Sequence, residues 1–175
     1  WRFVNYTSGA NALGSSDLSL KTYRRRDGRD GIISQNGAMG AGVSEYSAGV
    51  CMVSGNGITS CETFFLGSNA GLTCPPTIEA GTDVWNVNVE LADRNGDKAI
   101  DVAVDFDYEL RPALTKRQIQ RFSDSALPCE ELMARRPKGP RGKASLVYLN
   151  HDNHFEPSPE AAQTLKLLHL EGKIR

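Results

Sequence analysis

The residues of this 175-residue chain with the clearest capacity for chemistry lie in one short segment near its C-terminus. Residues 146–156 form an apolar run followed by a polar turn that holds His151, His154 and Glu156. Imidazole nitrogens are common zinc ligands, so His151 and His154 form an alternative metal-binding pair. Because a close histidine pair in a polar turn is usually solvated, and His169 is the only other histidine, we expect no metal site and no cofactor.

The same segment resembles the strand that presents the catalytic histidine and its orienting acid in ovarian-tumour-type cysteine proteases. The resemblance is carried by His154, Phe155 and Glu156, which follow an apolar strand-like run. It implies hydrolysis by a thiol nucleophile. Cys129 is the candidate nucleophile because it opens a predicted helix, where the helix dipole favours a thiolate. That family also has an Asp-Gly-x-Cys motif that this chain lacks, so a Cys129/His154 hydrolase is an alternative to the main expectation.

A second cluster of oxygen-bearing side chains lies in the middle of the chain. It resembles the front of a calcium-binding EF-hand or dockerin loop, with oxygen ligands at the first, third, fifth and ninth places. In place of the glycine and glutamate that follow in that pattern, this chain has Lys98 and Val104. We therefore expect a hairpin turn here and no metal. The alternative calcium ligands are Asp93, Asn95, Asp97 and Asp101.

Two short clusters of basic side chains are candidate sites for anions or for an acidic partner. The first spans residues 23–29, and the second is a Pro/Gly-rich loop over residues 135–143. Arginine-rich loops contact phosphates in nucleic-acid-binding proteins. These loops carry few aromatic residues, and the chain has a pI of about 6.4, so phosphate or nucleic-acid binding is a further alternative that is not favoured. The candidate residues are Arg24, Arg25, Arg26, Arg135, Arg136, Lys138, Arg141 and Lys143.

The best-marked element is a hairpin around Asn95-Gly96. The residues on both sides alternate between apolar and polar side chains, and Asn-Gly favours a two-residue type I′ turn. Folding the chain at this turn creates one apolar face, and a slip of one residue would destroy it. The predicted pairs are Leu91 with Ile100, Val89 with Val102, Val87 with Val104 and Trp85 with Phe106.

A second hairpin is predicted over residues 49–65, with Cys51 and Cys61 on its two strands. A three-residue loop ending at Gly57 places these cysteines opposite one another, whereas a two-residue loop places Cys51 opposite Glu62. A disulfide between two cysteines of the polar middle segment is one expectation, and buried free thiols are the other. The disulfide candidates are Cys51, Cys61 and Cys74.

After residue 112 the pattern changes to alternating helix and strand signals. Thr115 is a predicted N-cap of a short helix, a second short helix begins after Pro128, and residues 144–149 are typical of a strand. Ser158 then begins a helix, with proline and an acid in its first turn, and Gly172 predicts its end. We therefore expect a β-rich domain over residues 1–112 and a helix–strand–helix extension over residues 113–175 that packs on it or on a neighbour.

Composition places the chain among soluble globular proteins. It is 39% hydrophobic and 23% charged, with a net charge of -1, and no run approaches the roughly 18 apolar residues of a membrane helix. The charge is segregated, at +3 over residues 1–30, -9 over 31–110 and +5 over 111–175. This segregation indicates electrostatic complementarity within the fold or between copies, and it excludes a uniformly basic or a uniformly acidic chain.

These observations together predict an α+β fold that is mainly antiparallel β, sandwich or barrel-like, with a C-terminal α/β extension. The expected function is that of a non-enzymatic structural or binding subunit of a larger assembly. Its expected partners are proteins, including copies of itself. Because the sequence begins at Trp1 rather than at methionine, we expect a processed chain, compatible with export, an organelle or a particle.

Overall fold

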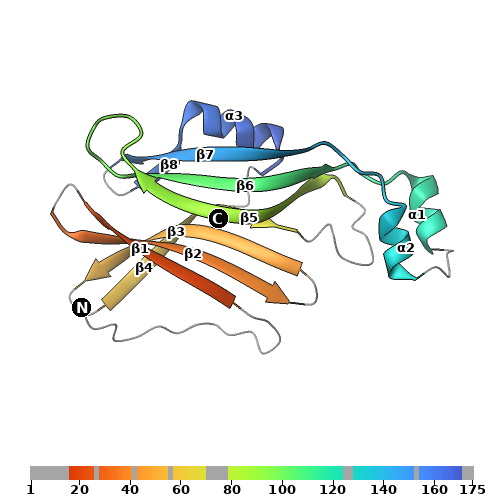
Figure 1. The fold of residues 1–175 in the computed structure, drawn as a ribbon, viewed down its shortest axis with the longest axis horizontal. Helices are drawn as coiled ribbons and strands as arrows, with labels where there is room; N and C mark the ends of the chain where they lie inside the picture. The colour runs from red at the N-terminus through yellow and green to blue at the C-terminus, as the bar shows by residue number, and fades with distance from the viewer. Residues whose placement is uncertain are drawn as a thin grey trace.

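The computed structural model describes residues 16–25, 28–40, 43–54, 57–69, 79–123, 128–151 and 154–170, which form two four-stranded antiparallel sheets and three short helices (Figure 1). The first sheet contains β1 (Ser16–Arg24), β2 (Asp30–Gly40), β3 (Val43–Ser54) and β4 (Gly57–Ser68). The second contains β5 (Gly81–Ala92), β6 (Asp101–Arg111), β7 (Arg141–His151) and β8 (His154–Pro157). The helices are α1 (Lys116–Ser123), α2 (Cys129–Ala134) and α3 (Pro159–Leu167). The prediction of a mainly antiparallel β fold is confirmed.

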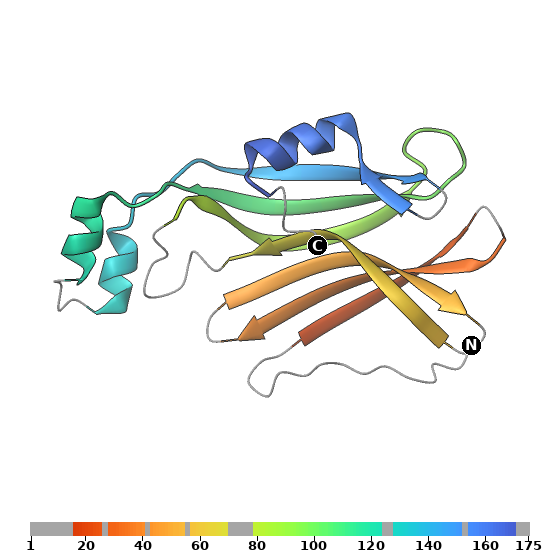
Figure 2. The same ribbon diagram turned by 180° about the vertical axis from the view of Figure 1, so that it is seen from behind.

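Both sheets are meanders in which strands that follow one another in sequence are neighbours in space. The strand predicted over residues 144–149 lies within β7, which pairs with β6 even though α1 and α2 separate the two in sequence. The predicted C-terminal extension therefore supplies half of the second sheet. It then continues into α3, which packs beside β7 and β8 (Figure 2).

The two sheets and α3 bury one shared core. On β4, the ring of Phe65 lies 5.4 Å from that of Phe106 on β6, and the ring of Phe64 lies 4.9 Å from that of Tyr148 on β7. Aromatic pairs in such tilted arrangements stabilise a fold by about 0.5–1.5 kcal/mol beyond the burial of their area. The residues that α3 and the turn after it add to this core are Ala161, Leu165, Leu168 and Leu170.

The start of α3 is confirmed as predicted, whereas its end comes earlier. Ser158 caps the helix, since its hydroxyl accepts a hydrogen bond from the Ala161 backbone N–H at 3.2 Å. The helix ends at Leu167, and His169 adopts a left-handed conformation with φ 51°. This turn directs Leu170 into the core, and burial of that side chain outweighs another helical turn. The predicted stop at residue 172 lies outside the described residues.

The hairpin of β5 and β6 is confirmed, but the predicted turn and register are wrong. Val89 pairs with Val104, two residues beyond its predicted partner, and a loop over residues 93–100 replaces the two-residue turn. The Asp93 carboxylate accepts hydrogen bonds from the backbone N–H groups of Gly96 at 2.7 Å and Lys98 at 2.9 Å. Such side-chain bonds to the backbone compete with the ladder and stabilise a longer loop.

A β-bulge in β5 reverses the face on which Trp85 lies. The register shifts between Trp85 and Asn88, and Asn86 within the shift has φ 52°, in the left-handed region. Val84 is consequently buried in the core, whereas Trp85 pairs with Asp107 on the opposite face. The predicted contact of Trp85 with Phe106 is therefore wrong, because one extra residue exchanges the faces of all the side chains beyond it.

A disulfide joins Cys51 on β3 to Cys61 on β4. The two residues pair directly, with their Cα atoms 4.0 Å apart. The three-residue loop predicted this pairing, but here Ser54 pairs with Gly57 and a shift in register within the hairpin brings the cysteines into line. Cys74 lies outside the described residues.

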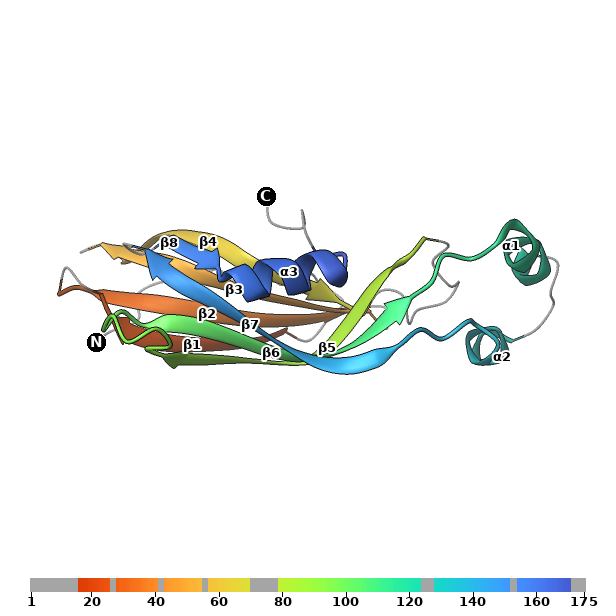
Figure 3. The same cartoon turned by 90° about the horizontal axis from the view of Figure 1, so that it is seen from above.

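The chain leaves β6 at Arg111 and returns to β7 at Arg141, and the segment between them projects beyond the end of the sheets (Figures 1 and 3). We call residues 112–140, which include α1 and α2, the arm. Among the described residues, no helix is long and apolar enough to cross a membrane.

Candidate protein-interaction site

The arm begins with a capped helix. The Thr115 hydroxyl accepts a hydrogen bond from the Gln118 backbone N–H at 3.3 Å, and the Gln118 side-chain oxygen accepts one from the Thr115 backbone N–H at 2.8 Å. This reciprocal capping box satisfies donors that the first turn of a helix leaves unpaired. The prediction of Thr115 as an N-cap is confirmed, and the cap fixes where the following charged side chains lie.

Helix α1 presents a basic surface. Lys116, Arg117 and Arg121 are exposed and have no hydrogen-bond or ion-pair partner among the described residues. The first turn holds no acid, so Lys116 and Arg117 stand at the positive end of the helix dipole, where each charge costs about 0.3–1 kcal/mol. These three residues were not among those predicted from the sequence. The signal that could have revealed them is basic residues directly after a cap, where acids are preferred.

A partly buried network of charges lies at the base of the arm, and we call it the neck. It consists of Asp83, Glu109, Arg111, Arg136 and Arg141. Arg111 Nη1 lies 2.7 Å from Asp83 Oδ1, and Arg141 Nη2 lies 2.5 Å from Glu109 Oε2. Arg136 is 8% exposed. Burial lowers the pKa of Arg136, as does repulsion by Arg111, while the two carboxylates act in the opposite direction. Arg136, a predicted partner-binding residue, is therefore an internal part of the neck.

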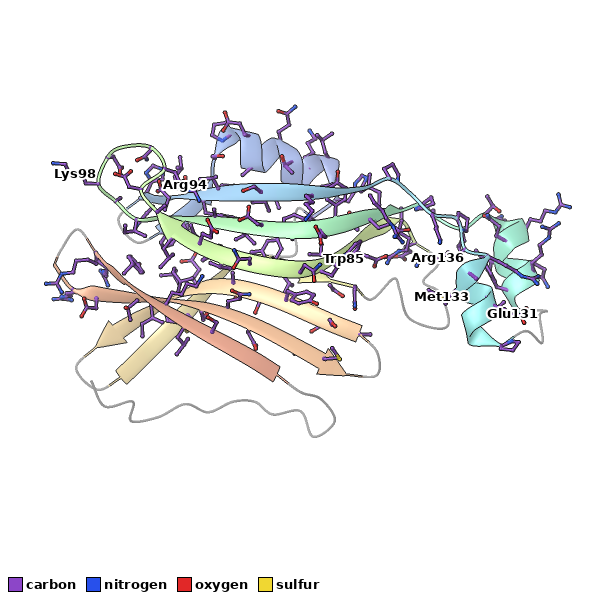
Figure 4. All side chains as sticks on the ribbon, viewed as in Figure 1. Trp85, Arg94, Lys98, Glu131, Met133 and Arg136 are labelled. Atoms are coloured by element: carbon purple, nitrogen blue, oxygen red, sulfur yellow. A yellow bond between two sulfur atoms is a disulfide. The ribbon has the colours of Figure 1, made fainter. Side chains whose placement is uncertain are left out.

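The return of the arm to the sheet is closely packed against β6. The Leu110 backbone N–H donates to the Pro140 carbonyl at 2.9 Å. A Cβ atom on Gly139 would lie 1.7 Å from the Leu110 carbonyl oxygen, so only glycine fits at that position. A backbone hydrogen bond and the ion pairs of the neck thus hold the arm against the second sheet. Figure 4 labels Arg136 at this place.

The first predicted basic cluster lies at the tip of the β1–β2 hairpin, at the end of the body opposite the arm (Figure 1). Arg24 pairs with Asp30 at 2.9 Å, and Arg25 is half-buried. Arg26 lies outside the described residues. The structure does not bring this cluster together with the second one.

The second predicted cluster is divided between the arm and the second sheet. Arg135 Nη2 lies 3.4 Å from a Glu131 carboxylate oxygen at the end of α2, and Lys138 is exposed. Arg141 belongs to the neck, and Lys143 Nζ lies 3.4 Å from Asp107 Oδ1 on β6. Exposed pairs of this kind contribute at most about 1 kcal/mol to stability, so they leave these side chains available for exchange with a partner.

The face of the second sheet that points away from the core carries Trp85 among charged side chains. The strand pairings place Trp85, Asp105 and Asp107 on this face with Lys143, and Glu90 lies further along β5. We call these five residues the outer patch. Trp85 is half-buried, Glu90 is exposed, and Asp105 has no partner among the described residues. The patch combines an aromatic ring with an excess of carboxylates.

Asp107 is held in its charged form within this patch. The Asn86 side-chain amide donates to Asp107 Oδ2 at 2.7 Å, and this bond is the largest influence that lowers the pKa of Asp107. Burial acts against the shift, and the charge of Lys143 adds to it. Asn86 thus has two effects: its backbone forms the bulge, and its side chain lowers the pKa of the carboxylate next to Trp85.

The predicted histidine pair is brought together by the β7–β8 hairpin. His151 and His154 pair directly, and His154 Nδ1 lies 3.2 Å from a carboxylate oxygen of Glu62 on β4, while its Nε2 lies 3.5 Å from one of Glu156. These side chains are exposed, and protonation of His154 would make the contacts ion pairs. Within the described part of the chain, no group of three or more His, Cys, Asp or Glu side chains has the arrangement of a metal site.

The structure separates Cys129 from this histidine pair. Cys129 begins α2 in the arm, and His154 follows the far end of β7. The 11 residues of β7 span about 36 Å at roughly 3.3 Å per residue. Only Glu156 of the proposed hydrolase residues lies within reach of His154.

The residues of the calcium-like loop bond to the loop's own backbone. Asn95 and Asp97 accept hydrogen bonds from the N–H groups two residues further on, at 3.0 and 2.7 Å. Asp101 is buried and accepts bonds from the backbone N–H groups of Arg94 at 2.9 Å and Asn150 at 3.0 Å. These bonds order the hairpin loop and tie it to β7.

Comparison with known proteins gave no match: no family model, no curated protein and no solved structure is significantly similar to this chain.

Proposed function

We propose that this protein is a non-enzymatic structural or binding subunit of a larger protein assembly, built as a two-sheet β-sandwich with a projecting arm. The observation that carries the proposal is the basic surface of α1. Lys116, Arg117 and Arg121 have no partner among the described residues, and the first two oppose the helix dipole. Charges retained against local preference are typical of functional surfaces.

The construction of the arm supports a role outside the fold. Among the described residues of the arm, Leu114 is the one buried apolar side chain. Hydrophobic burial is the main stabilising term of folding, so the arm adds little to the core. Its attachment through the buried pair of Asp83 and Arg111 instead fixes its direction, since buried ion pairs contribute more to geometry than to stability.

The sandwich is supported by contacts between the two sheets. Lys21 and Gln35 of the first sheet donate hydrogen bonds to the backbone carbonyls of Val89 and Val87 on β5. These bonds satisfy part of the outer edge of β5, which would otherwise offer carbonyl groups to other chains. With this edge occupied, side-chain surfaces such as the arm are the more suitable places for contact with a partner.

The proposal is tested by sedimentation velocity and light scattering on the full chain, from about 1 µM to about 500 µM and from 0.05 to 1 M salt. Because salt shortens the Debye length from about 14 Å to about 3 Å over this range, an assembly held by charged surfaces is expected at low salt and should dissociate at high salt. A strictly monomeric species that is insensitive to salt at every concentration would overturn the proposal.

A further inference from the structure

We infer that α1 in the arm of one copy docks on the outer patch of a second copy, with Arg117 and Arg121 placed against Trp85 and Asp105. This inference rests on the proposed function and names its partner, a second copy of this chain. Among the residues that the structure describes, α1 is the one helix whose basic face has no partners. The outer patch is the one face of the second sheet that combines an aromatic ring with acidic side chains.

The chemistry of the outer patch fits a cation. The indole ring of Trp85 attracts ammonium and guanidinium groups through its π face. Asp105 supplies a carboxylate on the same face, as does Glu90, which forms an exposed pair with Arg94 at 3.3 Å. Lys143 already lies 3.4 Å from Asp107, which leaves Asp105 for an incoming group. Arginine is the cation that best combines stacking on an aromatic ring with bonds to a carboxylate.

The outer patch depends on a locally unfavourable backbone conformation in β5. The bulge at Asn86 moves Trp85 out of the core, and Asn86 takes a left-handed conformation to do so. Bulges often re-aim a side chain beside a functional site, and a left-handed backbone at a residue other than glycine has an energetic cost. The core gains nothing from an indole ring on the outer face, so a contact outside the monomer accounts for it better.

The spacings of the two surfaces agree. Arg117 and Arg121 are four residues apart on α1, so their side chains share one face and lie about 6 Å apart along the helix axis. Trp85 pairs with Asp107, which is two residues from Asp105 on β6, so Trp85 and Asp105 lie about 7 Å apart along the strand direction on one face of the sheet. One turn of α1 can therefore place one arginine against Trp85 and the other against Asp105.

The contact requires a second copy because the arm points away from the second sheet, which carries the patch. In Figures 1 and 3, α1 lies beyond the end of β6, and Figure 4 places Trp85 on β5, between the arm and the middle of the body. The contact joins two different surfaces, so each docked pair leaves one arm and one patch free. Such heterologous contacts build rings or chains of copies.

A charge-swap experiment tests the docking. The arm variant carries Arg117→Glu and Arg121→Glu, and the patch variant carries Glu90→Arg and Asp105→Arg. Each variant alone should associate at least about tenfold more weakly than the unmodified protein, because like charges then meet. An equimolar mixture should recover association, because every arm then meets a patch of opposite charge.

The control variant carries Arg24→Glu and Arg29→Glu, which reverse the same number of exposed charges at the tip of the β1–β2 hairpin in the first sheet, away from both surfaces. It should associate as the unmodified protein does. Far-UV circular dichroism and thermal unfolding establish that every variant is folded. Trp85→Phe keeps an apolar ring with a weaker cation–π attraction, so it should weaken association in a protein that remains folded.

The outcomes separate this inference from the proposed function. If the arm variant associates as strongly as the unmodified protein, or if the mixture of folded variants does not recover association, the docking is overturned and the proposed function stands. If the unmodified protein is monomeric under all conditions, both are overturned. If it associates only when a polyanion such as heparin is added, and the arm variant does not, α1 binds a polyanion and the docking is again overturned.

Discussion

The substitution Asp83→Ala is expected to destabilise the protein by about 3–5 kcal/mol, because it leaves arginine charge buried in the neck. Asp83 is almost fully buried, and its carboxylate lies 2.7 Å from Arg111 Nη1. At that distance the attraction is about 6 kcal/mol at an effective dielectric constant of about 20. Water that enters after the substitution solvates the arginine and so offsets part of the lost attraction. The expected loss therefore agrees with the cost of removing one partner of a buried pair in other proteins.

Urea unfolding at pH 7, followed by far-UV circular dichroism with the disulfide intact, measures this loss. The midpoint of thermal unfolding should fall by roughly 6–20 °C, since each kcal/mol corresponds to about 2–4 °C in a chain of this size. The matched control is Asp30→Ala, which removes an aspartate from the exposed pair with Arg24. Exposed pairs contribute at most about 1 kcal/mol, so the control should unfold nearly as the unmodified protein does.

Hydrogen exchange locates the effect. In the Asp83→Ala protein, the amides of α1 and α2 should exchange faster, because Arg136 and Arg111 would repel one another without the carboxylate between them. Equal and small losses of stability for Asp83→Ala and Asp30→Ala, below about 1 kcal/mol, would contradict this prediction. They would mean that water reaches the neck and screens its charges.

Three further predictions follow from individual side chains. The Tyr148 hydroxyl is buried without a hydrogen-bond partner among the described residues, and burial raises its pKa; Tyr148→Phe should therefore be neutral or stabilising by up to about 2 kcal/mol at pH 7. Because the folded-state pKa is the higher one, the unmodified protein should lose stability as pH rises above about 10, and a pH series of urea midpoints should show this loss to be smaller in the variant. Replacing Cys51 and Cys61 by serine should lower the free energy of unfolding by about 3 kcal/mol, from the loop entropy of a separation of 10 residues; equal midpoints for the unmodified protein with and without reductant would contradict it. Phe65→Ala should cost about 3–5 kcal/mol and Trp85→Ala about 1 kcal/mol or less, because only Phe65 lies in the core; equal losses would place Trp85 in the core.

Elements specified by local residues were predictable from the sequence. The Ser158 cap and the proline after it mark the start of α3, and Thr115 marks the start of α1. The alternation of residues 84–91 and 100–106 correctly paired β5 with β6. In each case the chain within a few residues determines the element, so its physical cause is visible in the sequence.

The predictions that were wrong, and the residues that were missed, depend on contacts in the folded chain that the sequence pattern does not reveal. The turn between β5 and β6 follows from hydrogen bonds of the Asp93 carboxylate, which overrule the Asn-Gly preference. The position of Trp85 depends on a bulge that no alternation pattern indicates. The burial of Arg136 depends on Asp83 and Glu109, which come from two other strands of the folded chain.

Two features of this protein work against its local stability, and both are connected with the proposed contact. Lys116 opposes the dipole of α1, and Asn86 takes a left-handed conformation in the bulge that places Trp85 on the outer face. Selection for stability alone would remove such features, whereas selection for a contact would retain them. The substitution Lys116→Glu should therefore stabilise the isolated chain by about 0.5–2 kcal/mol, because an acid replaces a base at the start of the helix. The same substitution should weaken self-association in sedimentation velocity. If it strengthens association, or leaves it unchanged while stabilising the chain, Lys116 is an ordinary surface charge and the link between its cost and the contact is lost.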